Sequence, residues 1–291
     1  SGVGDVGSVV LRDRRHLAQD GMVVVVVSMS GEDGALVSGP DIITRGFVYV
    51  KESEGLMDEL RQVALDAILD GLGLDGVDGM LFDLGVSSPQ LDDGERGFSY
   101  RTDAPLDMRM DTRAALSARN LVNEAPEEEI ANILWQFGEE RASRAIARTM
   151  VKARAQAPIT TTAQLARIVE SVLPRKGRQH PGTRTFQALR IAVNGELDAL
   201  DALLDSSVRL LGQGGRMAVI TFHSLEDRRV KQFFDLRSRP EIDRPEWPAP
   251  RPNPDYCFRP LSRKPVTAGE EELSTNPRSR SAKLRGVEKI I

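Results

Sequence analysis

Two strand-like segments enclose a long region of helical periodicity, and this order limits the folds open to the chain. Gly79–Val86 and Arg216–His223 have the apolar character of buried strands. Between them, helices are expected after Pro126, after a cap at Thr160–Thr162, and over about Thr185–Leu211, where glycines follow. A doubly wound α/β domain interrupted by a helical subdomain has this order of elements: strand, helical insertion, helix, glycine turn and strand.

The first seventy residues are predicted to form a separate small α/β module. Val23–Met29 is a β-branched run typical of a buried strand, and Ala35–Val37 and Gly46–Lys51 are shorter strand candidates. Leu56–Leu69 has helical spacing. Beyond the helical region, Ser224–Phe234 is a charged amphipathic helix, and the proline-rich stretch Pro240–Pro265 predicts an extended surface loop.

Composition excludes several classes of protein. The 291 residues are 40% hydrophobic, which is enough for one large core or two moderate ones. A single cysteine, Cys257, excludes an internal disulfide framework, and no metal site is expected. The longest apolar run, Met22–Val27, is too short to cross a bilayer, so a cytoplasmic protein without a membrane partner is expected.

Basic residues cluster in two places, although the net charge is −4. Residues 175–190 and residues 274–291 each hold five basic side chains, opposed by no acidic residue in the first stretch and only Glu288 in the second. Such clusters can bind nucleic-acid phosphate, but a solvated surface explains charge alone equally well.

The sharpest local feature is the segment Leu81–Gln90, with the sequence LFDLGVSSPQ. An acidic residue at the end of a hydrophobic strand, followed by a polar turn, places a carboxylate at the strand's carboxyl end. Ligands bind at that edge in open α/β sheets. The long loop-like stretch Ser87–Asp111 that follows is also typical of a functional loop.

From about residue 70 to the C-terminus, the sequence resembles the RsmH (MraW) family of methyltransferases, which use S-adenosylmethionine (SAM) to methylate the N4 amine of a cytidine in small-subunit (16S) rRNA. The resemblance is carried in order by Asp83–Asp93, Arg96–Phe98, Pro105–Asp111, Gly138–Arg141, His180–Pro181, Thr183–Ala188, Arg190–Ile191, Val193–Asn194, Gly214–Arg216, Phe222–Arg228 and Asn276–Ser281.

This resemblance implies a cofactor, SAM, contacted by Asp83 and Gln90. It also implies that Asp83 and the turn Ser87, Ser88 and Pro89 form the catalytic group that holds the target amine. A cytosine amine is a weak nucleophile because its lone pair is delocalised, so catalysis would come from positioning and electrostatics. No covalent nucleophile is needed.

Further residues are implied to contact the RNA. Arg184 and Arg190 would bind backbone phosphate while the base is held outside its stack. His223 and Ser224 would contact the target base or its loop, with a strand-end histidine of purely structural role as the alternative for His223. The cluster near the C-terminus would add Arg278 and Arg280 as a second backbone contact.

The N-terminal part departs from this family. Its glycine-rich loop ending in Gly-Gly-His is absent, and Gly2–Gly7, formally GxGxxG, lacks the preceding strand that a nucleotide loop requires. Residues 2–66 resemble instead the C-terminal domain of bacterial ribonuclease J, a small accessory and self-association module, through Gly2–Asp13, Val23–Val27 and Ser38–Val50. The chain therefore has the character of a chimera joined between Leu65 and Asp78.

We accordingly expect a Rossmann-like SAM methyltransferase sheet, its N-terminal strands missing or replaced, with an inserted all-α subdomain and a preceding small α/β module. The module would cover residues 1–70, the methyltransferase core residues 71–111 and 205–291, and the RNA-recognition insertion residues 112–204. Activity would be impaired if the missing glycine-rich loop is not replaced. The alternatives are an inactive chimera that binds RNA, and a ribonuclease J-type accessory module that forms a homodimer.

Overall fold

The computed structural model describes residues 24–28, 47–51, 75–84, 94–173 and 180–291 of the chain. The chain divides into two compact units. The sheet unit comprises Ser1–Ser53, Glu59–Gly85 and Leu200–Ile291, and the helical unit comprises Glu54–Asp58 and Val86–Ala199. No helix in the described ranges is long and apolar enough to span a membrane.

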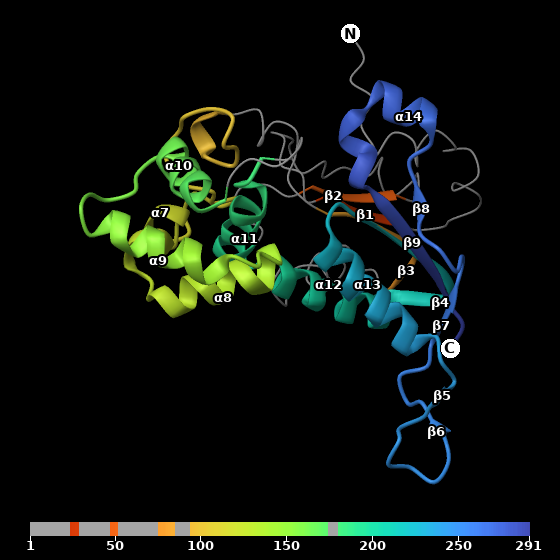
Figure 1. The fold of residues 1–291 in the computed structure, drawn as a ribbon. Helices are drawn as coiled ribbons and strands as arrows, with labels where there is room; N and C mark the ends of the chain where they lie inside the picture. Colours follow the sequence, from red (N-terminus) through yellow and green to blue (C-terminus); the bar gives the residue numbers. More distant parts are fainter. Residues whose placement is uncertain (1–23, 29–46, 52–74, 85–93, 174–179) are drawn as a thin grey trace. The chain divides into compact units, whose positions relative to one another are not determined.

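One mixed sheet forms the centre of the sheet unit (Figure 1). Its strands lie in the order β2-β1-β3-β4-β9-β7, and β8 also pairs with β9. The pairs among β2, β1, β3 and β4 are parallel, whereas β9 runs antiparallel to β4 and β7. The strands are β1 (Val24–Ser28), β2 (Phe47–Lys51), β3 (Val77–Asp83), β4 (Leu211–Thr221), β7 (Phe258–Pro260), β8 (Val266–Thr267) and β9 (Lys283–Lys289).

The N-terminal strands belong to this sheet. Strands are confirmed within the predicted segments Val23–Met29 and Gly46–Lys51. β1 lies between β2 and β3, with Val24 to Ser28 opposite Gly79 to Asp83. The predicted α/β fold is therefore confirmed, and two strands that precede β3 in the chain are present in its sheet. The predicted strand Ala35–Val37 and helix Leu56–Leu69 lie outside the described residues.

The central strands β3 and β4 carry the core of the sheet unit. Phe82 of β3 and Met217 and Val219 of β4 are fully buried on one face of the sheet. On the other face Leu81 and Ile220 are also buried, as expected for parallel strands covered on both faces. The glycines before Arg216, predicted to be a turn, belong to β4, and the β3–β4 register shifts between Val77 and Gly79 to accommodate them. β4 is therefore longer than the predicted strand.

The remaining elements of the sheet unit follow β4. Helix α13 contacts β4, β7 and β9, and the proline-rich stretch contains a short antiparallel hairpin, β5–β6. These elements are α13 (Ser224–Arg237), β5 (Glu241–Ile242), β6 (Arg251–Pro252), α14 (Glu270–Thr275) and the 3-10 helix η2 (Pro277–Ser281).

The helical unit is built from short amphipathic helices (Figure 1). Ser117 caps α7 and Thr161 caps α10, each in a reciprocal capping box that satisfies otherwise unpaired backbone N–H groups. Ile130, Ile146 and Leu165 point into its core and are fully buried. The elements are η1 (Gly94–Arg96), α7 (Ala118–Glu124), α8 (Glu127–Gly138), α9 (Ser143–Arg154), α10 (Thr162–Val172) and α11 (Thr183–Asn194).

The single long helix predicted over Thr185–Leu211 is wrong. The chain instead forms α11 and a second helix, α12 (Glu196–Leu210). Gly195 separates them with a φ of 59°, a left-handed conformation that ends a helix and that glycine adopts without a steric penalty.

Candidate functional site

The parallel part of the sheet defines where a ligand would bind. The chain runs from β1 to β2 on one side, and then returns to place β3 on the other side of β1. In doubly wound folds with this strand order, ligands bind in the crevice outside the carboxyl ends of the two strands at which the direction reverses. Here these strands are β1 and β3, which end at Ser28 and Asp83, and these two residues are register partners.

Asp83 stands at the carboxyl end of β3, as predicted. Asp83 is half-buried and directly follows Phe82, which is fully buried. On its other side Asp83 pairs with Ile220 of β4, and the next backbone N–H, of Leu84, donates to the Ile220 carbonyl oxygen at 3.1 Å. The edge is thus held by strands on both flanks. The predicted Ser87, Ser88, Pro89 and Gln90 lie outside the described residues.

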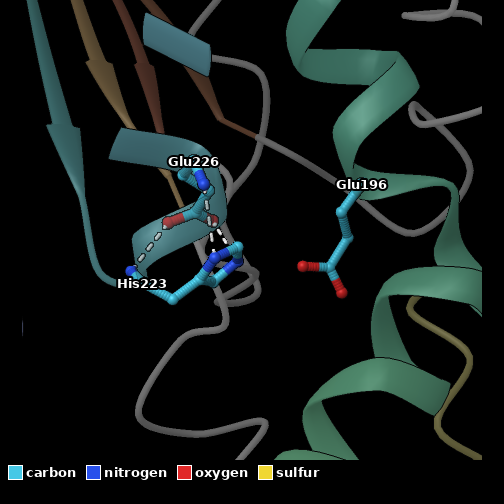
Figure 2. A group of neighbouring side chains, drawn as sticks. All are labelled: Glu196, His223 and Glu226. Carbon is cyan, nitrogen blue, oxygen red and sulfur yellow. Dashed lines mark hydrogen bonds and ion pairs between the residues drawn. The ribbon is translucent and has the colours of Figure 1, made fainter. Parts of the chain in front are cut away.

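His223 and Ser224 follow β4 at the same edge of the sheet, as predicted, and they start α13. The His223 Nδ1 atom accepts a hydrogen bond from the Glu226 backbone N–H at 3.3 Å (Figure 2). The Glu226 carboxylate in turn accepts from the backbone N–H groups of Phe222 and His223 at 2.8 and 3.2 Å. This capping box fixes the imidazole. Ser224 is exposed.

The second ring nitrogen of His223, Nε2, faces the Glu226 carboxylate. Nε2 lies 3.0 Å from the Glu226 Oε1 atom, but it is buried and forms no hydrogen bond with the described residues. Since Nδ1 accepts from a backbone N–H, the neutral ring carries its proton on Nε2. The buried Nε2–H of His223 thus lies beside the Glu226 carboxylate, at the carboxyl edge of the sheet.

The basic cluster near the C-terminus divides into paired and exposed members. Lys283 and Arg285 donate to the two carboxylate oxygens of Asp227 at 2.9 and 2.7 Å. Lys289 donates to the carbonyl oxygens of Val208, in the last turn of α12, and of Leu211, the first residue of β4, both at 2.7 Å. Arg280 is exposed. Arg278 lies in η2, and its side chain is outside what the structure describes.

Asp227 is the buried centre of this cluster. Burial by itself raises the pKa of Asp227, but the hydrogen bonds from Arg285 and Lys283 and their positive charges outweigh it. The pKa of Asp227 consequently lies below its ordinary value. The ion pairs join α13 to β9 and keep the carboxylate charged at neutral pH.

The two arginines predicted to bind phosphate lie on α11, in different environments. Arg184 is exposed, and its guanidinium donates to the Glu139 carbonyl oxygen at 3.1 Å. Arg190 forms a bidentate ion pair with the buried Glu196, with both N–O distances 2.7 Å. Its side chain is 15% exposed. The guanidinium of Arg190 thus links α11 to α12.

Asn194, which belongs to a segment shared with the methyltransferase family, holds the loop before α7 in place. Asn194 donates from Nδ2 to the Met108 carbonyl oxygen at 2.8 Å, and its Oδ1 accepts from the Met110 backbone N–H at 2.7 Å. Met108 is buried with a φ of 62°, which is strained for a side chain of this size. These two bonds hold that conformation.

Two features of the site were missed from sequence. The place of β1 beside β3 could not be found, because a run of valines shows that a strand is buried but not which strand it pairs with. The capping role of His223 had a signal, since Glu226 stands three residues later as in a capping box.

Comparison with known proteins gives two family matches. The MraW methylase family matches residues 48–290, and the ribonuclease J C-terminal domain matches residues 9–74. The two matches overlap over residues 48–74, so no sharp join separates them. β1 lies only in the ribonuclease J-like part, β2 lies at the beginning of the overlap, and β3 lies only in the methylase part.

Curated relatives are similar over most of the chain. A Brevibacillus brevis protein is 52% identical over 226 residues, which cover 77% of this chain and 72% of the relative. A Nitrobacter hamburgensis protein is 52% identical over 258 residues, covering 85% and 75%. A Methylobacterium protein is 47% identical over 273 residues, covering 91% and 77%. Each is named ribosomal RNA small subunit methyltransferase H.

Proposed function

This chain belongs to the MraW methylase family, a family of SAM-dependent methyltransferase enzymes, and on that premise we propose that it methylates the N4 amine of a cytidine in small-subunit (16S) rRNA. The substrate class is supported by the names of its relatives, which all act on small-subunit ribosomal RNA. The choice of cytidine N4 rests on the motif around Asp83. Such an enzyme would work in the cytoplasm, where its ribosomal substrate is.

The observation that carries this proposal is the pairing of β1 with β3, whose carboxyl ends meet at one edge of the sheet. The parallel order and the Ser28–Asp83 register put a half-buried carboxylate where doubly wound folds bind a nucleoside cofactor. The position of this carboxylate supports SAM as the cofactor. When bound, SAM supplies an electrophilic methyl group on a sulfonium centre. We assign Asp83 and Gln90 to hold it.

Transfer to the amine requires orientation rather than a covalent nucleophile. As the amine attacks, its lone pair leaves conjugation with the ring and its nitrogen becomes positively charged. Oxygen acceptors beside the amine stabilise that charge and take up the proton. We assign this role to Asp83 and the Ser87-Ser88-Pro89 turn. The buried Nε2–H donor of His223 suits a carbonyl or ring nitrogen of the base, and Ser224 its flanking nucleotide.

RNA recognition is assigned to the helical insertion, residues 112–204, and to the C-terminal tail. Arg184 is exposed and is proposed to contact phosphate directly. Arg190 is proposed to contribute by positioning α11 against α12 through Glu196. Arg278 and Arg280 add the second backbone contact. Accordingly, Arg184→Gln should weaken RNA binding with unchanged thermal stability, whereas Arg190→Gln should lower stability as well.

Calorimetric titration with SAM tests the proposal. Micromolar binding by the full chain that is lost in Asp83→Ala is the expected result. Asp78→Ala is the matched control, because Asp78 lies near the opposite end of the same strand and is exposed. Methyl transfer from labelled SAM to small-subunit rRNA, followed by nucleoside analysis, would then identify the methylated atom. No heat of binding at high protein concentration would refute the enzyme assignment.

A second candidate function is supported by the ribonuclease J match. The resemblance to a self-association module supports a homodimer, in an inactive chimera that binds RNA without SAM. Light scattering after size-exclusion chromatography distinguishes this candidate, which requires twice the 32.0 kDa mass of one chain. A monomer that binds SAM would exclude it.

A further inference from the structure

Helix α9 is anchored by one face and exposes the other. Ile146, Ala147 and Met150 are fully buried. The helix contacts α7, α8 and α10 within the helical unit. Its remaining surface carries the exposed residues Arg144, Arg148 and Lys152, and the exposed Arg141 precedes it in the adjoining turn. We call these four residues the α9 basic face.

The spacing of the α9 basic face gives it a definite geometry. With 3.6 residues per turn, Arg144, Arg148 and Lys152 lie within roughly 80° around the helix axis. Over eight residues the helix rises about 12 Å. In duplex DNA, for comparison, the phosphates of one strand follow each other about every 3.4 Å along the axis. The face is therefore long enough to contact several consecutive phosphates.

This arrangement is unfavourable for the isolated helix. Arg144, Arg148 and Lys152 are like-charged neighbours at i, i+4 spacing, which destabilises a helix. Arg144 also places a positive charge in the first turn, at the positive end of the helix dipole. α9 contains no acidic residue in its own sequence. The pair between Arg148 and Glu127, at 3.6 Å, is exposed and therefore weak.

We propose that the α9 basic face binds the phosphate backbone of RNA. A row of cations that repel one another gains most from a partner with regularly spaced negative charge, and RNA provides one along its whole length. The identity of that RNA, the small-subunit rRNA around the target nucleotide, rests on the proposed function. The contact is to the backbone and thus independent of base sequence. It is distinct from the basic cluster at residues 175–190.

The test is RNA binding by the full chain without SAM. The triple variant Arg144→Gln, Arg148→Gln and Lys152→Gln retains good helix formers. Fluorescence anisotropy with a labelled small-subunit rRNA fragment is recorded from 50 to 200 mM KCl. Removing three phosphate contacts should make the negative slope of log K against log salt shallower by about 2 to 3 and weaken binding on the order of 100-fold at 0.1 M.

The matched control removes three charges elsewhere in the same unit. Arg101, Arg119 and Arg167 are exposed and lie outside α9, so Arg101→Gln, Arg119→Gln and Arg167→Gln change the net charge equally. The slope of log K against log salt measured for this control should differ from that of the unsubstituted protein by no more than about one. An equal loss in both triple variants would overturn the proposal, since general charge would then explain the binding.

Two further measurements keep the outcomes separate. Thermal unfolding of the α9 variant should be unchanged or shifted upward, because repulsion is removed; a clear decrease would show a structural role and count against the proposal. If the α9 variant lost binding to anionic lipid vesicles while its RNA binding was unchanged, the proposal would also be overturned, because the α9 basic face would then bind a membrane surface. Because SAM is absent, failure of methyl transfer leaves this test unaffected.

Discussion

The pairing of β1 with β3 can be tested by a disulfide. Val26 and Leu81 are register partners in neighbouring parallel strands. Adjacent strands lie about 4.8 Å apart, within the range of Cα separations that a disulfide spans. In a Cys257→Ser background, Val26→Cys with Leu81→Cys should therefore oxidise to one intramolecular bond. The bond closes a loop of about 55 residues, so the chain-entropy relation predicts stabilisation of about 4 kcal/mol over the reduced form.

The assay is a thiol count with and without denaturant, gel mobility without reductant, and urea unfolding of the oxidised and reduced protein. The control is Val26→Cys with Phe82→Cys, because Phe82 is the next residue along β3 and points to the opposite face. Two free thiols in the Val26–Leu81 protein, or equal oxidation of both proteins, would refute the placement of β1. The crevice assigned to SAM would then lose one of its two strands.

Three further outcomes follow from the structure. Asp227→Asn should destabilise the protein at pH 7 by roughly 2–3 kcal/mol, because two cations lose their partner. Since the pKa of Asp227 is lowered in the folded state, this contribution is present above the unfolded pKa near 4 and is lost as the pH falls through the folded pKa. Urea unfolding at pH 7 and pH 3 should therefore show a difference in unfolding free energy between parent and variant that shrinks at the lower pH. A difference that stays constant would contradict the ion pairs. Gly138→Ser should cost about 1–3 kcal/mol in thermal unfolding, because a Cβ there would lie 2.7 Å from the Arg184 carbonyl oxygen. Gly269→Ser is the control and should leave stability unchanged, because a Cβ there meets nothing within 4 Å. If both substitutions changed stability equally, the close contact between Gly138 and Arg184 would not exist.

Local structure was predictable where a residue acts on its neighbours in the chain. The cap at Thr161, the helix beginning after Pro126 and the strand ending at Asp83 depend on local sequence, and each was found. The break at Gly195 was missed because Leu197 and Leu200 continue the apolar period of α11. Only the left-handed conformation shows that the two helices are separate.

Side-chain partners were less predictable than elements. Arg184 and Arg190 stand in one basic stretch and have the same charge, yet one is exposed and the other is paired with Glu196. The difference depends on Gly195, which ends α11 and allows Glu196, the first residue of α12, to pair with Arg190. Charge counted along a sequence therefore predicts where RNA could bind, but not which cations the fold has already used.

The place of β1 in the sheet follows from what a parallel strand needs. A central strand in such a sheet requires backbone hydrogen bonds on both sides and favours β-branched residues, and Val24–Val27 meets both requirements whatever its origin. A cofactor loop needs more, because glycines must allow the backbone to approach the ligand. The sheet can thus be restored by a segment that resembles ribonuclease J while the Gly-Gly-His loop is absent. SAM affinity, rather than folding, is therefore the property in which this chain should differ most from its relatives.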